Sequence, residues 1–241
     1  MQYAIGVPHI GKFSGGFVDS LAGLVRPADG FNLIRIQGLP VDEARNEIVK
    51  RFLDSTGEFL LMLDSDMVFH PRSLERLARQ LNGIQIFPGG CDMVAALAFT
   101  RYVPVCPTIF RGVAKIENDH EYLYIQIDET YDWIQKHRPH SMTCPTVFPA
   151  IPLDAMTPAD STGGAFVLIK REVFEGVEQP WFVRDGLKRG EDMFFFEKAR
   201  HAGFKLWVDR SVIVGHEWGG LYIGSRDFVA YRNALPEEAI T

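Results

Sequence analysis

The most constraining feature of the sequence is a continuous apolar run, Phe59-Leu60-Leu61-Met62-Leu63, which ends directly at Asp64 and Asp66. A short run without polar alternation is typical of a parallel strand that is buried on both faces by helices. Open α/β sheets bind their ligands beyond the carboxyl ends of such strands. The run therefore predicts an α/β fold with both aspartates at the ligand-binding edge of the sheet.

Short apolar runs and amphipathic stretches alternate through the N-terminal half of the chain. Besides the run at 59–63, strands are expected at residues 3–7, 31–36 and 93–99. Helices are expected at 17–25 and at 41–53, and over 41–53 the apolar residues recur at helical spacing. Strands and helices in this order imply an open, mostly parallel sheet that is flanked by helices, with right-handed crossovers.

The segment from Tyr102 to Pro158 differs from both of its flanks. It is rich in proline, alternates apolar and polar residues around 122–127, and shows little helical period. It predicts a smaller antiparallel insertion followed by a long loop, and long loops inside a domain are commonly functional or mobile. We therefore expect one domain, 1–241, with a first part at 1–100, an insertion with a flexible loop at 101–160, and a last part at 161–241.

The last part of the chain resumes the strand and helix pattern. A strand is expected at residues 163–169, and a helix over 191–202 that ends at Gly203, a residue suited to the position after a helix. Two short strands are expected at 204–208 and 211–214.

Composition excludes several classes of protein. A formal charge of −6 and a pI near 5.7 argue against a chain that coats nucleic acid or an anionic membrane. No run of about 18 apolar residues and no secretion signal is present, so we expect a soluble, cytoplasmic protein without a membrane partner. The three cysteines lie far apart without a CxxC pair, which supports neither a disulfide framework nor a thiolate zinc site.

The aspartates that follow the apolar run are the clearest chemical signal. Residues two apart in an extended chain project to the same side, so Asp64 and Asp66 can converge on one point. Two carboxylates at close range are electrostatically costly unless a cation neutralises them, and hard oxygen ligands suit Mg²⁺ or Mn²⁺. The alternative interpretation is a solvated acidic turn that caps the next helix.

Two further signals come from the last part of the chain. Gly190-Glu191-Asp192 begins a helix, where one carboxylate can serve as a general base, although the helix dipole alone favours acidic residues there. His216 follows the last short strand, where an imidazole can bind the same cation; the alternative is a structural histidine.

The three signals taken together resemble a known family. Their order and spacing are similar to those of the metal-dependent glycosyltransferases of GT-A fold, particularly the inverting, family-2-like group. Three more segments extend the resemblance: Asp42-Glu43-Ala44-Arg45-Asn46, Thr162-Gly163-Gly164-Ala165-Phe166 and Pro180-Trp181-Phe182. One departure concerns the base of the nucleotide, because Gln37-Gly38 stands where the family usually has an acidic residue.

The resemblance implies a role for each matching residue. The residues are Asp64, Asp66 and His216 for the metal, Mn²⁺ or Mg²⁺; Pro8, Arg45, Asp64, Ser65, Gly163 and Gly164 for the donor nucleotide sugar; and Asp192 and Glu191 for catalysis. Asp66 would coordinate the metal, while Asp64 would reach it through water or contact the ribose. Asp192 would deprotonate the acceptor hydroxyl, with Glu191 orienting it. Residues 1–100 would then bind the nucleotide sugar, and residues 161–241 would hold the acceptor and the catalytic groups.

The donor implied by the resemblance is a UDP- or GDP-sugar, and the acceptor is a saccharide, a protein or a modified nucleobase. Trp181, Phe182, Trp218 and Tyr222 are candidates for exposed aromatic residues that stack on the acceptor, although each is equally suited to a core. Lys188 and Arg189 are weaker candidates for phosphate contacts, and Gly219-Gly220 for a flexible lid.

Two other functions remain open at this point. A nucleotidyltransferase has a related α/β sheet, but it usually carries a Gly-rich, Arg-containing loop after the first strand, and the Gly-rich segment His9–Gly16 has no arginine. A catalytically inactive module that binds nucleotide sugars or carbohydrates is the second alternative. Neither a GxGxxG nor a GxxxxGK[ST] motif is present, which argues against dinucleotide oxidoreductases and P-loop ATPases.

Overall fold

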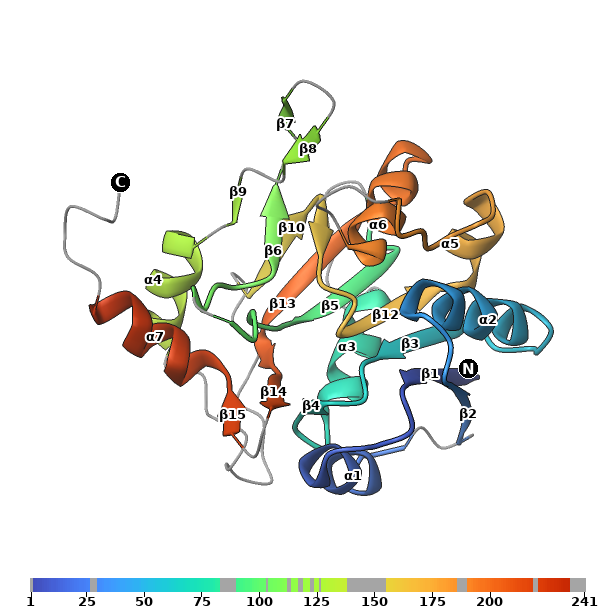
Figure 1. Ribbon diagram of the computed structural model, residues 1–241, viewed down its shortest axis with the longest axis horizontal. Helices are drawn as coiled ribbons and strands as arrows, with labels where there is room; N and C mark the ends of the chain where they lie inside the picture. The colour runs from blue at the N-terminus through green and yellow to red at the C-terminus, as the bar shows by residue number, and fades with distance from the viewer. Residues whose placement is uncertain are drawn as a thin grey trace.

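The computed structural model describes residues 2–26, 30–82, 90–102, 104–111, 114–116, 119–121, 124–125, 127–137, 155–185, 190–218 and 221–234. Its centre is a seven-stranded sheet in the order β10-β13-β5-β12-β3-β1-β2 (Figure 1). The strands are β1 (Tyr3–His9), β2 (Phe31–Gln37), β3 (Phe59–Leu63), β5 (Met93–Leu97), β10 (Met156–Ala159), β12 (Phe166–Lys170) and β13 (Leu206–Ile213).

Five strands of the central sheet run in one direction. The pairs β1·β2, β1·β3 and β13·β5 are parallel, whereas β12 runs antiparallel to β3 and β5, and β10 runs antiparallel to β13. The predicted α/β fold with an open, mostly parallel sheet flanked by helices is confirmed. β3 lies between β1 and β12 with all five residues buried, as its uninterrupted apolar sequence requires.

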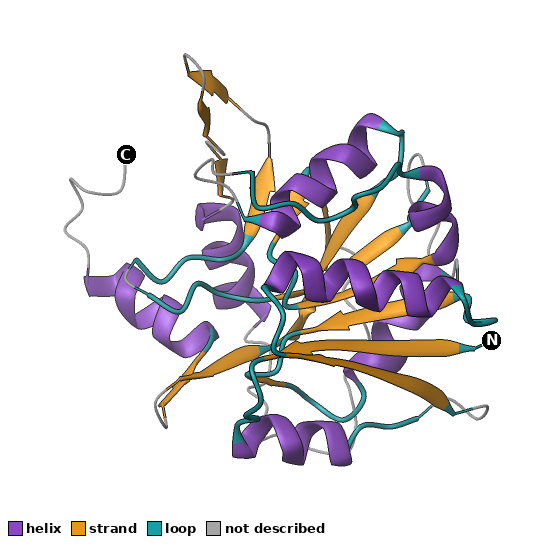
Figure 2. Ribbon diagram, turned by 45° about the vertical axis from the view of Figure 1, so that its right-hand side comes forward, coloured by secondary structure: helices purple, strands orange, loops and turns teal. Residues whose placement is uncertain are grey.

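Helices cover both faces of the sheet (Figure 2). They are α1 (Gly15–Ala22), α2 (Val41–Leu53), α3 (Ser73–Leu81), α4 (Ile127–His137), α5 (Arg171–Gly176), α6 (Glu191–His201) and α7 (Ser225–Ala234). One apolar cluster joins one face of the sheet to α2, α5 and α6, with Phe52, Phe174 and Phe195 at its centre. A second cluster joins the other face to α1 and α3 through Phe17 and Leu77. In the part of the chain described, no helix is both long and apolar enough to cross a membrane.

Short strands form three smaller sheets. One sheet has the strand order β15-β14-β4 and consists of β4 (Met67–Val68), β14 (Gly215–Trp218) and β15 (Leu221–Ile223). Another has the order β11-β6-β9 and consists of β6 (Ile109–Arg111), β9 (Tyr124–Ile125) and β11 (Ser161–Thr162). β7 (Ala114–Ile116) and β8 (Asp119–Glu121) form a hairpin, which projects from the body of the molecule in Figure 1. The β4·β14 pair matters for the site, because it joins the segment after β3 to the segment after β13.

The structure corrects two details of the predicted elements. The insertion contains the helix α4 besides its antiparallel strands, although its sequence lacks a clear helical period; its buried residues include Thr130, Trp133 and Ile134. The two short strands expected at 204–208 and 211–214 are the single strand β13, whose pairing with β5 is interrupted by a register shift between Asp209 and Ile213. A bulge of this kind breaks the apolar alternation without ending the strand.

Candidate active site

One edge of the central sheet brings together the sequence segments that carry the candidate residues. β1, β2, β3, β5 and β13 end at this edge, and β12 begins there because it runs in the opposite direction. The Asp64 N–H donates to the Ala165 carbonyl oxygen at 3.0 Å, and the Glu217 N–H donates to the Asp66 carbonyl oxygen at 2.8 Å. Residues distant in sequence are therefore fixed side by side by main-chain hydrogen bonds.

The Arg45 side chain links the two acidic motifs. Its guanidinium lies 2.8 Å from Asp64 through Nη2 and 3.2 Å from Glu191 through Nε, and Nη1 donates to the Gly164 carbonyl oxygen at 3.1 Å. Only 3 % of the side chain is exposed. The buried arginine of α2 thus holds one carboxylate from the β3 end and one from the α6 start.

Asp192 is held by the backbone rather than by a cation. Its Oδ2 accepts the Gly164 N–H at 2.8 Å, and its Oδ1 accepts the Met193 N–H at 2.8 Å. The Gly164 donor lies in the segment before β12, and the Met193 donor lies in the first turn of α6, where unpaired N–H groups and the helix dipole favour a negative charge. A carboxylate has about four lone-pair sites, so two acceptor positions on Asp192 remain for a substrate hydroxyl.

Asp66 and His216 lie close together. β4 and β14 pair Met67 with His216, and Asp66 Oδ2 forms an ion pair with Arg101 at 2.7 Å. The His216 imidazole is buried, and its Nδ1 has no hydrogen-bond partner within the described residues. Burial lowers the pKa of His216, while the Asp66 carboxylate opposes that shift.

The site carries more negative than positive charge. The four carboxylates of Asp64, Asp66, Glu191 and Asp192 are opposed by two guanidiniums, those of Arg45 and Arg101. Burial, reinforced by the other three carboxylates, raises the pKa of Asp64 to about 6 although Arg45 opposes it. Burial likewise raises the pKa of Glu191. The folded chain therefore holds a group of acids whose charges favour an additional cation.

The remaining donor candidates occupy the same edge. Pro8 is buried within β1 and pairs with Ile36, and the carbonyl oxygen of His9 accepts the Gly38 N–H at 3.0 Å. Ser65 lies half-buried in the turn after β3, and Gly163 precedes the Gly164 contact to Arg45. Along the edge strand β2, from the end of β1 to the last turn of α2, a cavity of about 450 Å³ is lined by His9, Asn32, Leu33, Ile34, Arg35, Gln37 and Arg51.

Two of the aromatic residues expected to be exposed are buried, so that expectation is wrong. Trp181 and Phe182 are each 2 % exposed. The Trp181 indole N–H donates to the Phe174 carbonyl oxygen at 3.0 Å, and the Phe182 ring stacks on Phe195 at 4.7 Å between centroids. Neither ring faces solvent, because both complete the core beneath α6.

Tyr222 is 39 % exposed, in line with the expectation. Several other candidates lie outside the part of the chain that the structure describes: the side chain of Trp218, the residues Lys188 and Arg189, and the glycines Gly219 and Gly220.

Sequence reasoning missed two residues of the site. Arg101 follows the end of β5, and the shared carboxyl edge of parallel strands was the signal that could have placed it beside Asp66. Asn46 accepts the N–H groups of Trp181 and Phe182 at 3.0 and 3.1 Å and donates to the Phe182 carbonyl oxygen at 2.6 Å. This clamp ties α2 to the segment that precedes α6. Both segments carry the family resemblance, but the resemblance assigned no role to Asn46 and did not indicate that the two segments are in contact.

No protein-family model matches the chain, and no curated protein matches it. Solved structures do. A197 from STIV superimposes with a TM-score of 0.60 at 17 % identity, over 93 % of this chain and 90 % of that chain. S. aureus TarS 1–349 in complex with UDP-GlcNAc superimposes with a TM-score of 0.50 at 15 % identity. GalNAc-T7 with UDP, GalNAc and Mn²⁺ superimposes with a TM-score of 0.53 at 11 % identity. This is the GT-A fold.

The extent of the match differs among these GT-A structures. The alignment covers 88 % of this chain and 57 % of TarS 1–349, and 99 % of this chain and 48 % of GalNAc-T7. The likeness thus extends over most of the chain but over only about half of the two longer proteins. At these identities it establishes the GT-A fold alone.

We expect Arg45→Met to lower the free energy of unfolding by about 3–5 kcal/mol, because it leaves the buried Glu191 and the half-buried Asp64 without their cation. Arg51→Met on the same helix is the control. Its ion pair with Glu47 is largely exposed, and we expect a loss below about 1 kcal/mol. Urea unfolding measures both, and equal losses would contradict the role assigned to Arg45.

A second prediction compares two adjacent glycines. A Cβ at Gly164 would overlap the Arg45 guanidinium, whereas a Cβ at Gly163 would meet Thr108 at an ordinary 3.6 Å. Gly164→Ala should therefore lower the free energy of unfolding by about 1–3 kcal/mol, and Gly163→Ala by less than about 0.5 kcal/mol. Thermal unfolding of the two variants checks this, and a larger loss at Gly163 would count against the described packing.

Proposed function

We propose that this chain transfers a glycosyl group from a nucleoside-diphosphate sugar to an acceptor hydroxyl. The observation that carries the proposal is the Arg45 contact to both Asp64 and Glu191, which assembles acids from the two halves of a GT-A sheet at its ligand-binding edge. The comparison structures solved with UDP-GlcNAc and with UDP, GalNAc and Mn²⁺ support this choice of donor. The donor is a UDP- or GDP-sugar.

Asp192 is the general base in this proposal. The two main-chain N–H donors fix its carboxylate at the start of α6, from which it accepts the proton of the acceptor hydroxyl. The hydroxyl oxygen then bonds to the anomeric carbon from the side opposite the leaving nucleoside diphosphate, so the configuration inverts. Glu191 stays paired with Arg45 and orients the helix start.

The donor atoms of Asp64, Asp66 and His216 are of the kinds that bind a divalent cation such as Mn²⁺ or Mg²⁺. The excess of carboxylates and the buried, unpartnered Nδ1 of His216 are the observations that support a metal bound by Asp64, Asp66 and His216. When bound, such an ion neutralises charge on the leaving diphosphate. Within the described residues, no three His, Cys, Asp or Glu side chains are grouped closely enough to hold a metal ion. Asp66 is paired with Arg101, so Asp66 would have to leave this ion pair to hold a metal ion.

The base of the nucleotide would lie at the ends of β1 and β2. Main-chain contacts there join His9 to Gly38, and the cavity beside them is lined by His9 and Gln37. Gln37 presents an amide rather than a carboxylate, and an amide both donates and accepts hydrogen bonds to a base. The acceptor is a saccharide, a protein or a modified nucleobase.

The proposal predicts release of nucleoside diphosphate when the chain is incubated with UDP- and GDP-sugars and Mn²⁺. Asp192→Asn should lower turnover by about 10²–10⁴-fold, because it removes the general base, and should leave donor affinity within about threefold. Glu197→Gln on the same helix is the control and should retain activity. Release of pyrophosphate would indicate a nucleotidyltransferase, and the absence of either product with every donor would indicate a binding module.

Metal affinity provides a separate prediction. Arg101→Gln frees the Asp66 carboxylate and removes a positive charge, so Mn²⁺ should bind about three to ten times more tightly. Arg72→Gln is the control, since its ion pair with Glu75 on α3 is similarly exposed but distant from the site. Titration of Mn²⁺ followed by electron paramagnetic resonance measures this, and an unchanged or weaker affinity in Arg101→Gln would contradict the proposed metal position.

A further inference from the structure

Three polar side chains gather on one face of the sheet where β1 and β2 end. The parallel register pairs Val7 with Arg35 and His9 with Gln37. Because residues two apart in a strand project to the same side, His9, Arg35 and Gln37 share one face. All three line the cavity of about 450 Å³ along β2, a volume in the usual range of small-molecule sites.

The Arg35 guanidinium is exposed and has no hydrogen-bond or ion-pair partner among the described residues. None of the described residues that line the cavity carries a carboxylate. The other arginine of the cavity, Arg51, stands on α2 and is paired with Glu47 at 2.9 Å. A guanidinium carries five N–H donors, and those of Arg35 therefore face the cavity and solvent without a protein acceptor.

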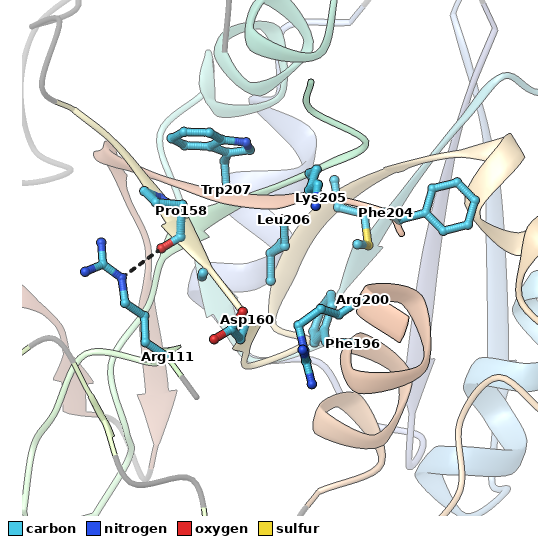
Figure 3. Close-up of a pocket in the computed structure, with 11 residues that line it drawn as sticks. Arg111, Pro158, Asp160, Phe196, Arg200, Phe204, Lys205, Leu206 and Trp207 are labelled. Atoms are coloured by element: carbon cyan, nitrogen blue, oxygen red, sulfur yellow. Dashed lines mark hydrogen bonds between the residues drawn. The ribbon is translucent and has the colours of Figure 1, made fainter. Parts of the chain in front are cut away.

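The cavity between α6 and β10 offers a comparison (Figure 3). There, Arg111 Nε donates to the Pro158 carbonyl oxygen at 3.4 Å, shown by the dashed line, and its Nη1 lies 3.7 Å from Glu129. The carboxylate of Asp160 lines that cavity as well. Arg111 thus has protein acceptors beside it, whereas Arg35 has none in the part of the chain described.

Two neutral groups accompany Arg35. The Gln37 amide lies against the loop after β1, where a Cβ at Gly11 would be 3.1 Å from its Nε2. The Gly11 N–H donates to His9 Nδ1 at 3.1 Å, so the proton of the neutral imidazole lies on Nε2. Partial burial lowers the pKa of His9, and the charge of Arg35 lowers it further, which keeps the ring neutral at pH 7. The cavity therefore presents one positive group flanked by neutral hydrogen-bonding groups.

This set of groups discriminates between the bases of the two proposed donors. Guanine has two adjacent acceptors, N7 and O6, that match the fork of a guanidinium, and arginine on these atoms is the commonest specific contact to a base. Uracil has no adjacent pair of acceptors, because its two carbonyl groups flank N3–H. Residues two apart in a strand are separated by about 6.6 Å, so Arg35 and Gln37 can meet neighbouring edges of one purine.

We propose that Arg35 makes this site selective for guanine, so that the donor is a GDP-sugar rather than a UDP-sugar. Arg35 donates to N7 and O6 of the base, and the Gln37 carbonyl oxygen accepts from N1–H. The inference rests on the proposed function in taking the donor nucleotide to lie at the ends of β1 and β2. Two of the comparison structures hold UDP, but at 15 % and 11 % identity they carry no information on this contact.

The test is isothermal titration calorimetry of the full chain with GDP, UDP, CDP and 7-deaza-GDP at one Mg²⁺ concentration. GDP should bind about 5–150-fold more tightly than UDP, the discrimination that a bidentate arginine contact provides. In 7-deaza-GDP a C–H group replaces N7, and its affinity should be lower by about threefold or more, because one N–H of Arg35 loses its acceptor. These comparisons use the unaltered chain, so they do not depend on the folding of a variant.

Arg35→Met should weaken GDP binding by about fivefold or more and leave UDP binding within about twofold. It should also bring GDP and 7-deaza-GDP to the same affinity. Arg35→Lys should not restore the preference for GDP, because an ammonium group lacks the planar fork. Arg51→Met is the control, since Arg51 lines the same cavity from α2 and should affect neither nucleotide.

Equal affinities for GDP and UDP, or for GDP and 7-deaza-GDP, would overturn the inference, as would a preference for GDP that persists in Arg35→Met. CDP bound as tightly as GDP would place the fork on O2 and N3 of cytosine and exclude a guanine site. The proposed function fails separately. Selective GDP binding without release of GDP from any GDP-sugar would contradict glycosyl transfer alone, and transfer from UDP-sugars alone would contradict the guanine assignment alone.

Discussion

The buried guanidinium of Arg45 is the interaction on which the candidate site depends. It contacts Asp64, Glu191 and the Gly164 carbonyl oxygen, and so joins α2, the end of β3, the start of α6 and the segment before β12. Without a cation at this point, the half-buried Asp64 and the buried Glu191 would repel each other across the sheet edge. The fold can hold an acidic site here because the Arg45 guanidinium binds the protein's own carboxylates rather than a ligand.

The site nevertheless remains acidic after Arg45 and Arg101 are counted. The raised pKa values of Asp64 and Glu191 reflect this imbalance, since burial and neighbouring carboxylates outweigh the arginine. Removing charged groups from water costs stability, and strain of this kind is commonly retained where function requires it.

Much of the fold could be predicted from sequence because its elements are locally encoded. The run at 59–63 and the helical spacing over 41–53 match β3 and α2 residue for residue. Contacts between distant segments could not be predicted in the same way. Trp181 belongs to a residue type that stacks on ligands when exposed, yet its ring is 2 % exposed and packs against Phe174 of α5. The resemblance assigns Arg45 to the nucleotide, whereas in the structure its guanidinium contacts Asp64, Glu191 and the Gly164 carbonyl oxygen. These contacts depend on tertiary packing, so the local sequence does not predict them.

The most direct test of the account is a pair of double-mutant cycles on the free energy of unfolding, one joining Arg45→Met with Asp64→Asn and the other joining Arg45→Met with Glu191→Gln. If Arg45 links both acidic motifs, each cycle should give a coupling energy of about 1–3 kcal/mol. A coupling near zero in either cycle would show that the arginine does not hold that carboxylate, and the assembled site described above would be contradicted.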